Sequence, residues 1–77
     1  MDIQTACAEF ESGRLQDVVI EPADEGNGWM ILLHDTAGEM VKITDHGGTE
    51  KIYHTIDHAT QVAKEIGFET IRVEERF

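Results

Sequence analysis

The chain has 77 residues and carries sixteen Asp and Glu against six Lys and Arg, a formal net charge of −10. This excess of acid argues against nucleic acid or an anionic membrane as a direct partner, because phosphate binding needs clustered Lys and Arg. The length allows one domain, residues 1–77, and leaves no room for a second core.

The first predicted element is an amphipathic helix over residues 3–12. Four apolar residues recur at spacings of three and four and so share one helical face: Ile3, Ala6, Cys7 and Phe10. Asp2 fits the N-cap, and Gly13 is a natural place for the helix to end.

Strand-like segments follow, rich in β-branched or apolar residues: 17–22, 29–35, 39–44 and 50–54. Pro22 favours a strand end or an edge position, because proline cannot donate a ladder hydrogen bond. Turns separate the later segments, a type I turn closed by Gly38 and another at Gly47 and Gly48.

A second helix is predicted after Thr55, which fits an N-cap, and Gly67 marks its end. Its apolar face consists of Ile56, Ala59, Val62, Ala63 and Ile66. Residues 70–74 alternate as a final strand. These elements predict a single small α+β domain of order α-β-β-β-β-α-β, with an antiparallel meander sheet packed by two helices.

The segment 29–35 is apolar on both faces and is therefore expected to be a central strand with cover on each side. The N-terminal helix, a second copy of the protein or a partner can supply the second cover. Interface candidates in this strand are Trp29, Met30 and Leu32. For Trp29, core packing is the favoured role, and an interface anchor is the alternative.

Acidic residues concentrate in the first third of the chain, where residues 1–28 hold seven acids against Arg14 alone. This distribution indicates either a docking surface for a basic protein or a solubilising surface. Candidates for the docking surface are Asp17, Glu21, Asp24 and Glu25.

Candidate metal ligands gather around the start of the second helix, with one histidine upstream: His46, His54, Asp57 and His58. Neither a cysteine pair nor a His-Glu-x-x-His spacing supports a metal site, so surface or structural roles are favoured and no cofactor is predicted. Cys7 lies on an apolar helix face, where a packed thiol is expected rather than a nucleophile. No catalytic residue is predicted.

The segment from Lys51 to Ala59, Lys-Ile-Tyr-His-Thr-Ile-Asp-His-Ala, followed by Ile66-Gly67-Phe68, resembles a pattern in small uncharacterised bacterial proteins, some of them plasmid-associated. The meander leading into a helix that opens Thr-Ile-Asp-His-Ala is also similar to HicB-like antitoxins. Their usual acid is replaced here by His58. The resemblance implies a bacterial protein and no catalytic residues.

We therefore expect a non-enzymatic accessory or regulatory protein that acts through protein–protein contacts, with a basic protein or a second copy as candidate partner. An antitoxin-like or nucleic-acid-mimicking inhibitor of a basic partner is one alternative. A metal-responsive protein using the His/Asp cluster is another. The start of the chain lacks the basic and apolar regions of a signal peptide, so a cytoplasmic location is expected.

Overall fold

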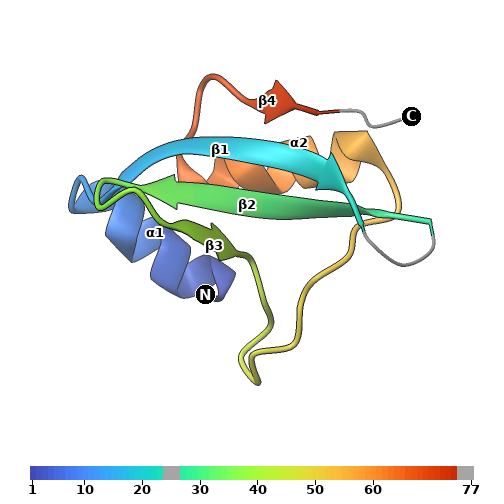
Figure 1. Ribbon diagram of the computed structural model, residues 1–77, viewed down its shortest axis with the longest axis horizontal. Coiled ribbons are helices and arrows are strands. Elements are labelled where there is room, and N and C mark those ends of the chain that lie inside the picture. The colour runs from blue at the N-terminus through green and yellow to red at the C-terminus, as the bar shows by residue number, and fades with distance from the viewer. Residues whose placement is uncertain (24–26, 75–77) are drawn as a thin grey trace.

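The computed structural model describes residues 1–23 and 27–74, which form a small α+β fold (Figure 1). In chain order its elements are α1 (Ile3–Glu11), β1 (Leu15–Pro22), β2 (Trp29–Asp35), β3 (Met40–Lys42), α2 (Ile56–Ile66) and β4 (Arg72–Val73). The predicted fold class is thus confirmed, and two of the predicted details are wrong.

The first correction concerns the sheet, which is mixed and not an antiparallel meander. Its strand order is β3-β2-β1-β4, with β1/β2 and β2/β3 antiparallel and β1/β4 parallel. The parallel pair aligns Val19 with Arg72 and Ile20 with Val73. Parallel pairing needs a crossover connection, and α2 supplies it by crossing the sheet before β4.

The second correction concerns residues 50–54, which do not form the predicted strand. They make only isolated bridges, Thr44 with Glu50 and Trp29 with Tyr53. The chain leaves the sheet after β3 for a turn in which the Asp45 carboxylate accepts backbone hydrogen bonds, and it meets β2 again only at Tyr53. A short antiparallel turn pairs residues 43–45 with 49–51, where the Asp45 N–H donates to the Thr49 carbonyl and the Lys51 N–H to the Ile43 carbonyl, but this pairing does not continue as a strand.

Both helices begin and end as their capping residues predict. The Asp2 carboxylate accepts a hydrogen bond from the Thr5 N–H at 2.7 Å, and the Thr55 hydroxyl accepts one from the His58 N–H at 3.0 Å. Gly67 ends α2 with a φ of +136°, a conformation that favours glycine. The helix α1 ends at Glu11, just before Gly13 with its φ of +79°.

The core lies between the sheet and the two helices, which pack on the same face of the sheet. Figure 1 shows α1 and α2 behind the strands, so the viewer faces the other side. The core side chains of the strands come from alternate residues: Val18, Ile20, Ile31 and Leu33. They meet Ala6 of α1 and the apolar face of α2, which is buried as predicted.

Candidate interaction face

The second face of the sheet has no helix over it among the described residues. Because Ile31 and Leu33 point into the core, Met30, Leu32 and His34 of β2 point to the other side. The register extends this face to the neighbouring strands. We call it the open face, formed by Asp17, Val19, Glu21, Met30, Leu32, His34, Met40, Lys42 and Arg72.

The centre of the open face is apolar and is already buried in the single chain. Val19, Met30 and Leu32 are 2%, 5% and 7% exposed although no helix covers them. The residues aligned beside them across the sheet include Lys42 and Arg72, whose long aliphatic stems can lie over apolar surface. At one corner Met40 is 50% exposed, so the accessible apolar surface lies at the rim.

The rim of the open face carries both signs of charge. Asp17 and Glu21 flank Val19 along β1, while Lys42 and Arg72 occupy the two outer strands. His34 Nδ1 lies 3.5 Å from Asp17 Oδ1 on this face. The Glu74 N–H continues the β4 ladder by donating to the Ile20 carbonyl, so Glu74 lies two residues beyond Arg72 on the same side, and acids outnumber permanent cations on the open face.

The predicted interface residues separate into two groups. Met30, Leu32, Asp17 and Glu21 meet on the open face, although sequence analysis assigned them to two different surfaces. Trp29 instead points to the helix side and packs partly buried against the core. The remaining candidates, Asp24 and Glu25, lie outside the described residues.

Acids of the first third of the chain do not line up on one surface. Asp2 caps α1, Glu9 pairs with Arg14 at 3.1 Å, and Glu11 is exposed at the end of α1. These three lie on the helix side of the sheet, whereas Asp17 and Glu21 lie on the open face.

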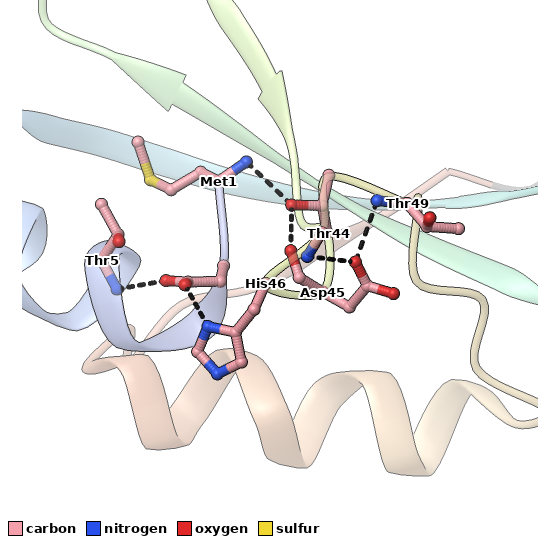
Figure 2. Close-up of polar contacts among 8 residues, drawn as sticks. Met1, Thr5, Thr44, Asp45, His46 and Thr49 are labelled. Carbon is pink, nitrogen blue, oxygen red and sulfur yellow. Dashed lines mark hydrogen bonds and ion pairs between the residues drawn. The ribbon is translucent and has the colours of Figure 1, made fainter.

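The candidate metal ligand His46 belongs to a clasp between the start of the chain and the loop after β3 (Figure 2). His46 Nδ1 lies 2.7 Å from Asp2 Oδ2, and the Met1 amino group donates to the Thr44 hydroxyl at 3.2 Å. The hydrogen bond of the Thr5 amide, with a smaller effect of His46, lowers the pKa of Asp2 below its usual 3.8.

The other metal candidates do not join His46. The His58 ring packs edge-on against Tyr53 at a centroid distance of 5.0 Å, while His54 and Asp57 are exposed. Within residues 1–23 and 27–74, no three His, Cys, Asp or Glu side chains lie close enough to hold a metal ion.

Tyr53 itself is an unusual part of the core. Its side chain is buried at 6% exposure, and its hydroxyl has no hydrogen-bond partner in the described part of the chain. Burial, with a smaller contribution from the Glu65 charge, raises the pKa of this phenol above 10.0.

A surface hollow of about 630 Å³ lies at the edge of β1 next to the loop that leads into β4. Phe10, Val18 and Phe68 form its apolar part, and Asp17 and Arg72 border it from the open face. Cys7 does not line this hollow; it lines a second hollow together with Asp2 and His46, and its thiol is 4.0 Å from the Glu65 carbonyl.

The sequence analysis did not name five residues of the open face as interface candidates: Val19, His34, Met40, Lys42 and Arg72. Alternation along each strand already indicated which residues share a side, but the partner strands were needed to join them into one surface. The parallel neighbour β4, which brings Arg72 beside Val19, could not be read from a local pattern.

Comparison with known proteins identifies no relative of this chain. No protein-family model matches the chain, and neither the curated proteins nor the solved structures contain a significant match. Among the described residues, neither helix combines the length and the apolar character that crossing a bilayer requires.

Proposed function

We propose that this protein is a non-enzymatic accessory or regulatory protein that acts through protein–protein contacts made by its open face. The observation that carries the proposal is the packing of both helices on one side of the sheet, which leaves the other side without a covering helix among the described residues. Sheets bury their apolar faces against a second layer, and here a partner would provide it.

The composition of the open face suits contact with a protein. Its centre of Val19, Met30 and Leu32 is apolar, Met40 is half exposed, and charged side chains form the rim. An apolar centre within a polar rim is the usual arrangement of a protein–protein interface. The alternative functions, inhibition of a basic partner and metal response, stay predictions from the sequence.

A photo-crosslinking residue at Met40 tests the proposal in cells that make the protein. We expect discrete crosslinked products from position 40, because this side chain lies at the accessible corner of the open face. The matched control is the same residue at Gln61, which is exposed on α2. If position 40 gives no product, or gives only the products seen from position 61, the proposal is wrong.

A further inference from the structure

The edge of β1 that faces β4 is only partly paired. β1 spans Leu15–Pro22, but only Val19 and Ile20 align with the two residues of β4. Among the described residues, no strand and no isolated bridge pairs with residues 15–18 on that side. Unpaired backbone groups at a sheet edge are a template for a further extended chain.

The loop before β4 diverges from this free edge and leaves the hollow of about 630 Å³ between them. Figure 1 shows the loop rising away from β1 before it enters β4. One wall of the hollow is residues 16–18 and the other is residues 67–70, and no backbone hydrogen bond joins these two segments. The gap closes where Arg72 aligns with Val19. Clefts that bind ligands have volumes of roughly 300–1,000 Å³, so the hollow is large enough.

The apolar part of the hollow offers an accessible aromatic ring. Phe10 and Phe68 pack edge-on with their ring centroids 4.8 Å apart. Phe68 is buried, whereas Phe10 is only partly buried and borders the hollow. In a strand added to β1, alternate side chains point to the helix side of the sheet and so lie next to Phe10.

At the closed end of the hollow, Arg72 presents a cation without a partner. Its side chain borders the hollow, and it makes no ion pair with any residue in the described part of the chain. Glu74 lies two residues further along the chain and does not line the hollow. Because an arginine can bind a carboxylate through two parallel hydrogen bonds, this position suits a carboxylate ligand.

The acids of the hollow lie nearer its open end. Asp17 precedes Val19, the partner of Arg72, by two residues, which is about 7 Å along β1. Its Oδ1 accepts no hydrogen bond among the described residues and lies 3.5 Å from His34 Nδ1. Glu69 is exposed on the opposite wall. The charge therefore changes sign along the hollow, from acids at its open end to a cation at its closed end.

We propose that the hollow binds the carboxyl-terminal segment of another protein, which adds to the free edge of β1 as a short parallel strand. A segment that continued past Arg72 would collide with β4, so a chain end fits the gap and an internal segment does not. The terminal carboxylate pairs with Arg72, the last side chain is apolar and lies against Phe10, and a basic side chain just before it lies near Asp17 and Glu69.

Strand addition at a sheet edge and capture of a terminal carboxylate are both established modes of peptide recognition, and here the same hollow offers both. The inference goes beyond the proposed function, because it assigns a second contact site at the edge of the sheet, next to the open face.

Isothermal titration calorimetry with two matched peptides tests the carboxylate contact. The probes are acetyl-Lys-Leu-Lys-Phe with a free carboxylate and the same peptide with a carboxyl-terminal amide. We expect the acid to bind at least about tenfold more tightly, because only the acid makes the charged hydrogen bonds to Arg72. Arg72→Gln should reduce this preference to less than about twofold. The matched control is Lys64→Gln, which removes an exposed cation that does not line the hollow and should keep the full preference.

The acidic end is tested with Glu69→Lys, which should weaken both peptides alike, by about threefold or more, because the peptide lysines then meet a cation. Its control is Asp57→Lys, an equal change of charge at an exposed position outside the hollow, which should leave both affinities unchanged.

Two further peptides test strand addition. One carries N-methyl groups on the Leu and Phe amides and the other on both Lys amides, so each lacks the donors along one side of the strand. We expect one of the two to bind at least about tenfold more weakly than the other. Amide chemical shifts should change at residues 16–18 and 67–70 when the unmethylated acid is added. Circular dichroism establishes that each protein variant is folded.

An acid peptide that does not bind at about 1 mM, or that binds no better than the amide, would overturn the inference. So would a preference that survives in Arg72→Gln, equal effects of the two methylation patterns, or shift changes confined to other residues. The crosslinking experiment distinguishes this failure from failure of the proposed function. Crosslinks from position 40 without peptide binding would leave the open face standing as the contact site, and peptide binding without such crosslinks would leave only the edge site.

Discussion

The two faces of the sheet are built from the same strands yet bury their apolar residues by different means. On the helix side, Leu33 is 0% exposed under side chains from α1 and α2. On the open face, its neighbour Leu32 is 7% exposed, although neither helix covers it among the described residues. The same strands therefore bury apolar residues on both sides, under the helices on one side and without a helix among the described residues on the other.

The largest expected effect comes from comparing Leu33→Ala with Leu32→Ala. We expect Leu33→Ala to reduce the free energy of unfolding by about 3 kcal/mol, because it leaves a cavity in a closed core. Leu32→Ala should cost about 1 kcal/mol, since neighbouring side chains can move into the space. Urea denaturation measured at low protein concentration gives both values. Equal losses would show that the two faces are equally closed.

A second prediction sharpens the comparison at the junction of the helices. The added Cβ in Gly67→Ala would lie 2.5 Å from the Phe10 ring and would take a φ of +136°. We expect a loss of about 2 kcal/mol from strain and overpacking together. Gly38→Ala is the control, because its φ is +89° and no atom lies within 4 Å. It should cost about 1 kcal/mol, and thermal unfolding measures both.

Tyr53→Phe tests whether water reaches the buried Tyr53 hydroxyl in the core on the helix side of the sheet. The substitution removes a buried hydroxyl that has no partner in the described residues, so we expect stability to stay the same or to rise by up to about 1 kcal/mol. Chemical denaturation of the two proteins in parallel gives the difference. A loss above that size would mean that the hydroxyl makes a hydrogen bond in solution and that water reaches this part of the core.

The smallest effect on stability is expected at the contact between Asp2 and His46. The pKa of Asp2 is lower in the folded protein than in the unfolded chain, so its ionised form stabilises the fold at neutral pH. This contribution is lost as the pH falls from about 4 through the lowered pKa. Titration followed by NMR should show the low pKa. His46→Ala should raise the pKa of Asp2 only slightly, because the hydrogen bond from the Thr5 amide is the main cause of the low value. A large rise would show that His46 is the main cause instead.

Local chemistry made much of the fold predictable from the sequence. Asp2, Thr55 and Gly67 mark helix ends because each satisfies a backbone requirement within a few residues of itself. The Asp35–Gly38 turn follows in the same way, with the Gly38 N–H donating to the Asp35 carbonyl at 3.1 Å. Such features need no knowledge of the rest of the chain.

What was not predictable depends on contacts between distant parts of the chain. Alternation in residues 70–74 indicated a strand but not that β4 would pair with β1 in parallel. The segment around Tyr53 has a strand-like composition, yet only single bridges form, one of them between Tyr53 and the distant Trp29. The candidate site shows the same limit, since the residues of the open face come from four different strands.

The parallel pairing of β1 with β4 also shapes how the chain acquires its fold. As the polypeptide leaves the ribosome, β1 and β2 can pair early, because a short connection joins them. The other edge of β1 receives its neighbour only after α2 and the residues beyond it have emerged. Until then that edge offers unpaired backbone groups to any extended chain nearby, so synthesis passes through a stage at which mispairing and aggregation compete with folding.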